Sequence, residues 1–472
     1  MTRRTDLLLL VNAMLGQFIS GFAARMFVVS LPTIAGALHA DILAISWAII
    51  AYQLAGISLS VVFGRLGDLH GRQAIYGGGF VIMTVSSLLC GFAPSALWLV
   101  LFRFVQGIGA AMLASATRVL AMEAMPDSAA GKANGFMTMS FHGGVLLGPP
   151  LGGLIIDLVG WRWTFFLLVP IGIAGTVLTV LKAREHRAAP AASAPAIDYG
   201  GAALLVVLTV VLTLLLDRRS AEMIGLGRTG FMALLFVATL GGFLVHERRA
   251  RHPVVNFALF KIRMFTFSVL SLLVIATSSS VLTFLLPFYM QDVLHQSPSF
   301  MGLIFLSAPV FTVTLAAVAG QVTDRVGPRI PASIGVLMSA AAFLVGTFLR
   351  IDSHWMLPAV LMAFTGLGQA FFNTPNQTAI IASVPREYRG FATGMVQTVF
   401  GLGALLGISL AGVLLTVAFR YASGLPDATP SAENPGPFVS AMNATFSVCL
   451  ALTGVAFVAS LMRGGKKVGT PP

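Results

Sequence analysis

Long apolar segments separated by short polar connections occupy almost the whole chain. Read by their length and by the charges that interrupt them, they predict fourteen helices, at about 7–36, 44–64, 74–93, 96–123, 132–157, 162–181, 199–216, 229–246, 265–290, 299–322, 330–349, 355–381, 391–419 and 439–462. A helix needs roughly 20 apolar residues to cross the hydrocarbon core of a bilayer. The pattern therefore predicts an all-α integral membrane protein with fourteen crossings.

Basic residues are unevenly divided between the two sides that these crossings define. Of the 29 lysines and arginines, twenty fall on the side of the N-terminus, six on the opposite side and three inside helices. Positively charged connections are retained in the cytoplasm, and an even number of crossings returns the chain to its starting side. Both termini are therefore predicted to be cytoplasmic. The first apolar segment is too long for the core of a cleavable signal peptide and is expected to be a retained helix.

The composition excludes several classes of function. Of the 472 residues, 57% are hydrophobic and 10% are charged, against roughly 25% charged residues in a soluble domain. The formal net charge of +12 is spread between apolar segments, so no nucleic-acid partner is expected. Cys90 and Cys449 lie in apolar segments, and paired carboxylates, histidine clusters and a phosphate-binding loop are missing. No enzyme, metal site or other cofactor is expected.

Two short motifs occur twice in the chain. GRLGDLHGR at 64–72 recurs as GQVTDRVGPR at 320–329, and GKANG at 131–135 recurs as GFATG at 390–394, with offsets of 256 and 259 residues. Such internal repeats are typical of secondary transporters. The predicted organisation is an N-terminal six-helix bundle at 1–182, a linker with an inserted helix pair at 183–264, and a C-terminal six-helix bundle at 265–472. A further loop is expected at 420–437.

Three motifs together resemble those of the major facilitator superfamily. They are the loop GRLGDLHGR, the segment RFVQGIGAA at 103–111 and the segment GGVLLGPPLGG at 143–153. With fourteen helices, the resemblance is to the drug/proton antiporter branch of that family. It implies two pseudo-symmetric six-helix bundles with a central inserted pair, and a multi-pass, monomeric protein of the cell membrane. The implied function is export of lipophilic or amphiphilic small molecules by alternating access, driven by protons.

The resemblance also assigns roles in coupling and gating. Arg103 is implied in proton coupling, with extension to the membrane interface as the alternative. Gly148 and Pro149 are implied as a hinge, with simple helix packing as the alternative. A charge relay or latch at the cytoplasmic ends of the helices, with interface anchoring as the alternative, is expected of Asp68, Arg72, Arg118, Glu123 and Asp324.

One position departs from the family pattern. The branch usually carries an aspartate eight residues before the Leu31-Pro32 pair, and this chain has Ala23 there, with Arg25 two residues further on. All seventeen acidic residues fall in loops or near predicted helix ends. This argues against proton coupling through a buried carboxylate and against cationic drugs as the substrates.

Polar residues inside the helices predict an amphipathic substrate cavity. Side chains of this kind within a membrane are candidates for function, although each alone is more often a contact between helices. The expected lining residues are Gln17, Arg25, Tyr52, Gln53, Gln106, His142, Gln369, Asn373, Asn376 and Gln397. His142 has a reference pKa near neutrality and is a second candidate for proton coupling.

Two other functions stay open from the sequence. One is transport of an anionic amphiphile or lipid, with Arg25 as the counter-charge and with atypical or no proton coupling. The other is a receptor or scaffold that uses the same fold without transport. Substitution of Arg25 separates the first alternative from export of cations, because only anionic substrates depend on that charge.

Overall fold

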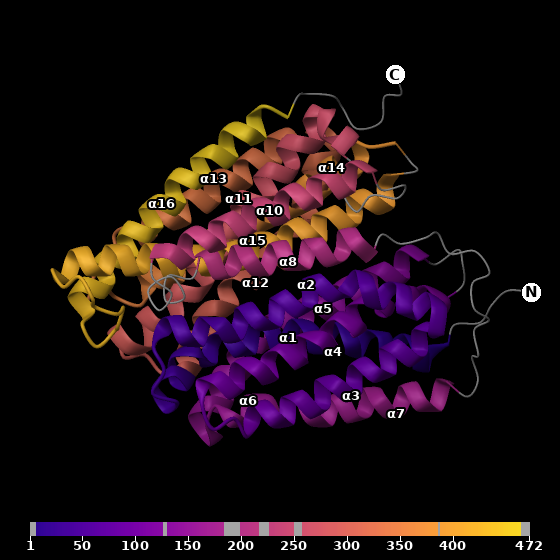
Figure 1. Ribbon diagram of the computed structural model, residues 1–472, viewed down its shortest axis with the longest axis horizontal. Coiled ribbons are helices and arrows are strands. Elements are labelled where there is room, and N and C mark those ends of the chain that lie inside the picture. Colours follow the sequence, from indigo (N-terminus) through magenta and orange to yellow (C-terminus); the bar gives the residue numbers. More distant parts are fainter. Residues whose placement is uncertain are drawn as a thin grey trace, which may run out of the picture. The chain divides into compact units, whose positions relative to one another are not determined.

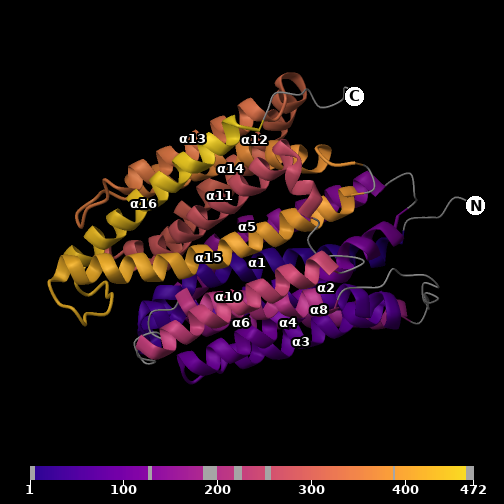
Figure 2. The ribbon, with the colours of Figure 1, turned by 45° about the horizontal axis from the view of Figure 1, so that its top comes forward.

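A computed structural model describes the chain except for residues 1–5, 126–129, 184–198, 217–225, 250–256, 386–387 and 464–472. The described residues form helices and connections, and no strand occurs among them. The chain divides into two compact units, Met1–Val211 with Ala233–Val254 and Ser297–Gly302, and Leu212–Met232 with Val255–Gln296 and Leu303–Pro472. Figures 1 and 2 show the helices of each unit running side by side.

The helices follow the apolar segments of the sequence closely. Those up to the middle of the chain are α1 (Leu7–Ala37), α2 (Ile42–His70), α3 (Arg72–Gly91), α4 (Ala96–Glu123), α5 (Ala130–Val159), α6 (Arg162–Phe166), α7 (Leu168–Ala183), α8 (Tyr199–Leu216) and α10 (Leu226–Arg249). The remainder are η2 (Phe257–Lys261), α11 (Arg263–Phe288), η3 (Tyr289–Val293), α12 (Pro298–Val326), α13 (Arg329–Gly346), α14 (Met356–Ala382), α15 (Arg389–Ser423) and α16 (Pro435–Leu461).

Thirteen helices of the described part are long and apolar enough to cross a membrane. The all-α membrane architecture expected from the sequence is thereby confirmed. The helix α8 has the bounds of the segment expected at 199–216, while the count of fourteen crossings and the cytoplasmic placement of the termini stay predictions. The three-part division at 182 and 264 also stays a prediction.

Two connections differ from the expected pattern. The segment 162–181 was expected as one helix, but it is interrupted at Leu167, between α6 and α7. Pro170 has no N–H to donate to the carbonyl of Phe166, four residues earlier, which weakens the helix at this point.

The loop expected at 420–437 is shorter in the structure. The helix α15 runs to Ser423 and ends at Gly424 with φ of 70°, and α16 begins at Pro435.

The duplicated motif forms the same turn in both units. Gly71 after α2 and Gly327 after α12 have φ of 97° and 80°, a backbone conformation that only glycine adopts without strain. Each of these glycines donates its N–H to the carbonyl four residues earlier, Gly67 at 2.9 Å and Thr323 at 2.8 Å. The packing pairs repeat as well: α1 with α5, α3 with α4 and α3 with α7 correspond to α11 with α15, α13 with α14 and α13 with α16.

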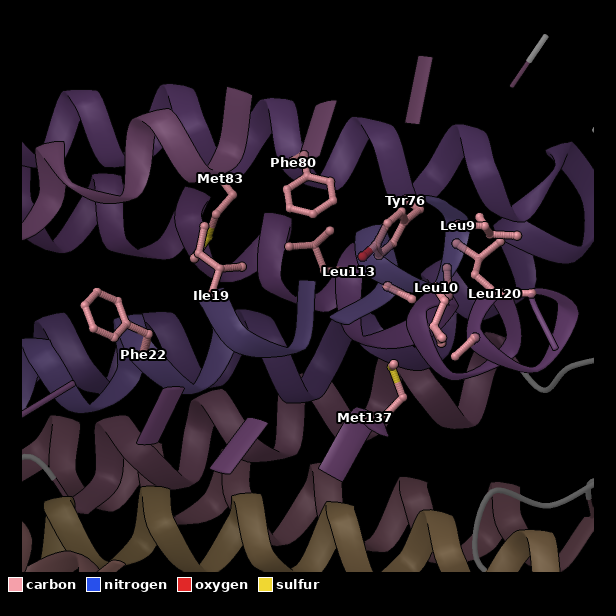
Figure 3. Close-up of a cluster of buried hydrophobic side chains, with 14 of the residues drawn as sticks. Leu9, Leu10, Ile19, Phe22, Tyr76, Phe80, Met83, Leu113, Leu120 and Met137 are labelled. Carbon is pink, nitrogen blue, oxygen red and sulfur yellow. The ribbon is translucent and has the colours of Figure 1, made fainter. Parts of the chain in front are cut away.

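The core of the first unit joins α1, α3, α4 and α5. Figure 3 shows Ile19, Phe80, Met83 and Leu113 pointing toward one another from three of these helices. The phenol of Tyr76 crosses the same region and donates to the backbone carbonyl of Asn12 at 2.7 Å. The Asn12 amide, a polar group that the sequence did not single out, donates to Thr179 Oγ1 on α7 at 2.8 Å. These bonds fix α1 against α3 and α7 in an otherwise apolar interior.

Candidate functional site

Arg103 lies in the interior of the first unit, where its side chain is 1% exposed. Its guanidinium is held between the rings of Phe27 and Tyr52, with the Cζ atom 4.1 and 4.3 Å from the two ring centroids. Cations placed over aromatic faces in this way are stabilised by the quadrupole of the ring. The side chain does not extend to an interface, so the alternative reading of Arg103 as an interfacial anchor does not describe its position.

Hydrogen bonds hold the same guanidinium from its other sides. Arg103 Nε donates to the Ala48 carbonyl at 3.2 Å, and Nη1 donates to Gln106 Oε1 at 2.6 Å. Gln106 in turn donates from Nε2 to Ser87 Oγ at 2.7 Å and is fully buried. Two of the expected cavity residues, Tyr52 and Gln106, therefore belong to a network around Arg103 that joins α2, α3 and α4.

Glycines bring the helices of the first unit close together. A Cβ at Gly107 would overlap the carbonyl oxygen of Tyr52, so α4 rests directly on the backbone of α2. A Cβ at Gly144 would overlap the Phe18 carbonyl and lie 2.7 Å from the Phe22 nitrogen, and one at Gly148 would lie 3.0 Å from the Cβ of Arg25. The motif expected to act as a hinge is thus the face of α5 that contacts α1.

The second unit reproduces these glycine contacts at nearly constant offsets. Gly366 meets the carbonyl of Ala308 as Gly107 meets that of Tyr52, and Gly407 meets the carbonyl of Thr277 and the Cβ of Ser280. The glycines Gly79, Gly107, Gly109, Gly144 and Gly148 correspond in this way to Gly335, Gly366, Gly368, Gly403 and Gly407. The offsets of 256 and 259 residues are those of the duplicated motifs, so the repeat extends through the packing faces of the helices.

The second half of α5 contacts residues 297–302, which cluster with the first unit and begin α12. A Cβ at Gly153 would overlap the Pro298 carbonyl, and a Cβ at Gly302 would overlap the Pro149 carbonyl. Asp157 Oδ2 accepts the backbone N–H of Ser299 at 2.9 Å and also the Ser299 hydroxyl. The only proline pair of α5 is therefore placed between the α1 contact and the start of α12.

A Cβ at Gly148 of α5 would lie 3.0 Å from the Cβ of Arg25 on α1, His142 lies on α5, and both side chains are half-buried. They are close enough for the charge of Arg25 to act on the His142 ring. In the described part of the chain, Arg25 has no hydrogen bond or ion pair, and the contact of His142 is with the ring of its neighbour Phe141 at 5.6 Å. Gln17 and Gln53, two other expected cavity residues of this unit, are also half-buried.

One pair of the expected charge relay is in place. Arg72 Nη1 lies 3.3 Å from Glu123 Oε1, which joins the start of α3 to the end of α4. Asp68 and Arg118 lie within helices, but their side chains are outside the described residues. Asp324, the counterpart of Asp68 in the second copy of the motif, is exposed on α12.

The expected cavity residues of the second unit differ in burial. Asn376 is fully buried and donates from Nδ2 to the Ser268 carbonyl at 3.3 Å, which joins α14 to α11. Gln369 and Asn373 are half-buried, and Gln397 is exposed. The cavity itself draws residues from both units and stays a prediction.

The second unit contains a buried arginine that the sequence did not distinguish from the other basic residues predicted to be cytoplasmic. Arg463 follows α16 and is 2% exposed, with Phe372 as an aromatic neighbour 5.7 Å from its Cζ. None of its three guanidinium nitrogens has a hydrogen-bond partner in the described structure. Burial lowers the pKa of Arg463 to about 9, so the group is still protonated at neutral pH. The sequence does not mark Arg463 as buried, since it is one of several basic residues that follow the last apolar segment.

We expect Arg463→Met to raise the stability of the protein at pH 7 by about 1–3 kcal/mol, because an unpaired buried charge is replaced by an apolar chain of similar length. Thermal unfolding of the purified protein measures this change. Arg389→Met is the matched control, since Arg389 is exposed, and it is expected to leave the unfolding temperature unchanged. A loss of stability in Arg463→Met would contradict this assignment.

The same burial predicts a pH dependence. The pKa of Arg463 lies at about 9 in the folded protein, well below that of an unperturbed arginine. The unfolded chain therefore binds more protons than the folded one above pH 9, and the contribution of this residue to stability rises with pH there. Below pH 9 the guanidinium is protonated in both states, so the free energy cost of burying its charge does not change with pH. The difference in stability between wild type and Arg463→Met is expected to narrow above pH 9.

Comparison with known proteins gives matches along most of the chain. A model of the Major Facilitator Superfamily matches residues 13–246 and 268–467. The riboflavin transporter RibZ of Clostridioides difficile (strain 630) is 27% identical over 421 residues, which cover 88% of this chain and 89% of that protein. The tetracenomycin C resistance and export protein of Streptomyces glaucescens is 30% identical over 433 residues, covering 90% and 78%.

Solved structures agree with these sequence matches. The inward-facing, unoccupied crystal structure of a bacterial homologue of the human lysosomal transporter Spinster matches with a TM-score of 0.69 and 15% identity, over 96% of each chain. At this identity the likeness concerns the fold alone. It agrees with the repeated helix packing found in the two units.

Proposed function

The chain belongs to the major facilitator superfamily, and from this premise we propose that it exports lipophilic or amphiphilic small molecules across the cell membrane by alternating access. The observation that carries the proposal is the repetition of the packing faces in the two units. Gly144 and Gly148 on α5 and Gly403 and Gly407 on α15 make the same backbone contacts with α1 and α11. Two such repeats, which change their mutual arrangement around a central site, are the architecture of secondary transporters.

Export is supported by the relatives and by the sequence. One relative is named as a resistance and export protein, and another as a riboflavin transporter. The exporter motif GGVLLGPPLGG is complete in α5, where Pro149 and Pro150 each lack the N–H that a helix needs for its backbone bond. The proposal includes fourteen crossings, cytoplasmic termini, a monomer in the cell membrane and proton gradient as the energy source.

Proton coupling in this protein differs from coupling through a carboxylate within the membrane. Ala23, which stands where the family carries an aspartate, is buried at 2% exposure. Of the described carboxylates on α4 and α5, Glu123 and Asp157 lie in the last turns of their helices and are bonded. His142 is the titratable side chain within α5 that we propose for proton exchange.

Reconstitution into liposomes tests the function. Three fluorescent probes are used that share one aromatic group and carry a permanent cation, an alcohol or a sulfonate, so that the pH gradient does not itself trap them. We expect saturable accumulation of at least one probe when the interior is acidic, and loss of this accumulation with a protonophore. Flux of all three probes at the rate of protein-free liposomes would overturn the proposal. Protein-dependent flux that is the same with and without the pH gradient would contradict proton coupling but not transport.

A further inference from the structure

Arg25 is an arginine near the middle of a membrane-spanning helix. It lies twelve residues from the nearer end of α1, or about 18 Å at 1.5 Å per residue. That distance is too long for its side chain to reach water beyond the helix end. A charged group at this depth is costly and is retained where it faces the interior of the bundle or a water-filled space. A counter-charge or a polar ligand is therefore expected beside Arg25.

The described helices that pack against α1 place no carboxylate at this level of the bundle. The helix α1 contains no acidic residue, and it packs against α2, α4, α5, α6 and α7. The acidic residues of these helices are Asp68, Glu123 and Asp157, each in the last turn of its helix. Glu123 already pairs with Arg72, and Asp157 accepts both bonds from Ser299. Asp6 and Asp41 precede α1 and α2 as N-caps.

His142 adds a second nitrogen donor to the same place. The contacts of Gly144 with Phe18 and Phe22, and of Gly148 with Arg25, show that α1 and α5 run in the same direction at close distance. Side chains on a helix point back toward its N-terminus, so the guanidinium of Arg25 reaches toward the level of His142. The charge of Arg25 acts on the His142 ring. The other basic group nearby on α4, Arg103, is turned inward and already bonded.

Neither side chain is needed for the packing of its helix. The corresponding contact in the second unit has Ser280 in the place of Arg25, because Gly407 meets Ser280 as Gly148 meets Arg25. By the offset of 259 residues that relates the two α5-type helices, Gly401 corresponds to His142. The fold thus forms the same helix pair with a hydroxyl and a glycine, and the basic pair is particular to the first repeat.

We propose that Arg25 and His142 bind the anionic group of the substrate, so that the transported molecules include amphiphilic organic anions. This inference rests on the proposed transport function and names the substrate class. The guanidinium plane donates two parallel hydrogen bonds to a carboxylate, sulfonate or phosphate. The imidazole donates a third. The apolar part of the molecule lies among the aliphatic and aromatic side chains that otherwise line α1 and α5.

Binding of the three charge-matched probes to the purified protein tests the inference. The protein is placed in nanodiscs of zwitterionic lipid, and fluorescence anisotropy gives the dissociation constants. We expect Arg25→Gln to weaken binding of the sulfonate probe tenfold or more, the value of a lost charge-assisted hydrogen bond, and to change binding of the alcohol probe less than twofold. His142→Gln is expected to weaken sulfonate binding several-fold, and Arg25→Lys is expected to fall between wild type and Arg25→Gln.

Arg162→Gln is the matched control. It removes the same charge from an exposed residue at the start of α6, and its affinities are expected to equal those of the wild type. Equal weakening of all three probes by Arg25→Gln, or unchanged sulfonate binding in Arg25→Gln and Arg25→Lys, would overturn the inference. Wild-type protein that binds the alcohol or the cation but not the sulfonate would also overturn it, while the transport function would stand.

Free organic anions and lipids share this chemistry, and a competition experiment separates them. Phosphatidylglycerol is added to the nanodiscs while the sulfonate probe is titrated. We expect the affinity of the probe to change less than twofold, since the proposal is for a free amphiphilic anion. Loss of probe binding that requires Arg25 and rises with the fraction of anionic lipid would overturn this choice and assign the site to a lipid headgroup.

Discussion

Replacement of Gly144 by valine is expected to destabilise the protein by about 3 kcal/mol or more and to abolish transport. The added atoms meet the Phe18 carbonyl oxygen and the Phe22 nitrogen. Both are backbone atoms inside α1 and cannot move aside as a flexible side chain does. Overpacking of this kind costs about 1–3 kcal/mol, and more where the backbone must shift. The helices α1 and α5 then separate, and with them Arg25 and His142.

The neighbouring glycine provides the control. A Cβ at Gly143 meets nothing within 4 Å, so Gly143→Val is expected to retain both stability and transport. Unfolding temperatures and probe flux of the two purified variants are compared side by side. Gly407→Val is expected to behave as Gly144→Val does, with Gly394→Val on the same helix as its control, because nothing lies within 4 Å of a Cβ there. Equal stability of Gly144→Val and Gly143→Val would show that the α1–α5 contact has been wrongly described.

Replacement of Arg103 by methionine is expected to destabilise the protein by about 2–4 kcal/mol. The substitution removes the N–H group that donates a hydrogen bond to Gln106 Oε1. It also removes the cation between the Phe27 and Tyr52 rings. A buried acceptor without a partner costs about 1–3 kcal/mol, and each cation–π contact contributes about 0.5–2 kcal/mol. Arg103→Lys is expected to recover little, because an ammonium cannot bond Ala48 and Gln106 while lying flat between two rings.

The same substitution thus has opposite expected effects at two buried arginines. Arg103→Met removes a guanidinium whose hydrogen bonds and ring contacts support the fold. Arg463→Met removes a guanidinium whose nitrogens are without hydrogen-bond partners in the described structure. Thermal unfolding of both variants at pH 7 measures the expected loss of stability in Arg103→Met and the expected gain in Arg463→Met. A gain of stability in Arg103→Met would show that the network around Arg103 does not support the fold.

The helices were largely predictable from the sequence because apolar length decides a membrane-spanning segment. The segment at 96–123 was predicted with the bounds of α4. The break at Leu167 was missed, since Pro170 acts locally within an apolar segment whose length and composition suggest one helix. The duplicated loop was found from Gly64 and Gly320, and the structure extends the repeat to glycines such as Gly107 and Gly366.

The candidate site was less predictable, because residue type does not say which way a helix face points. Tyr52 and Gln106 were expected beside a cavity, and the sequence did not indicate that both contact Arg103. Arg25 and His142 were chosen separately, for their depth in the helices, and the close approach of α1 and α5 brings them together. The burial of Arg463 has no signal in the sequence, where it is the first of several basic residues after the last helix.

Alternating access is tested most directly by a cysteine at position 17. The native cysteines, Cys90 and Cys449, are fully buried and are replaced by alanine, and Gln17→Cys then places one thiol on the half-buried face of α1. A membrane-impermeant maleimide is added to right-side-out and to inside-out vesicles, with and without the sulfonate probe and a pH gradient. The account predicts that adding the sulfonate probe and the pH gradient raises the labelling rate in one type of vesicle and lowers it in the other. Rates that rise and fall together on both sides, or a thiol that reacts from neither side, would contradict it.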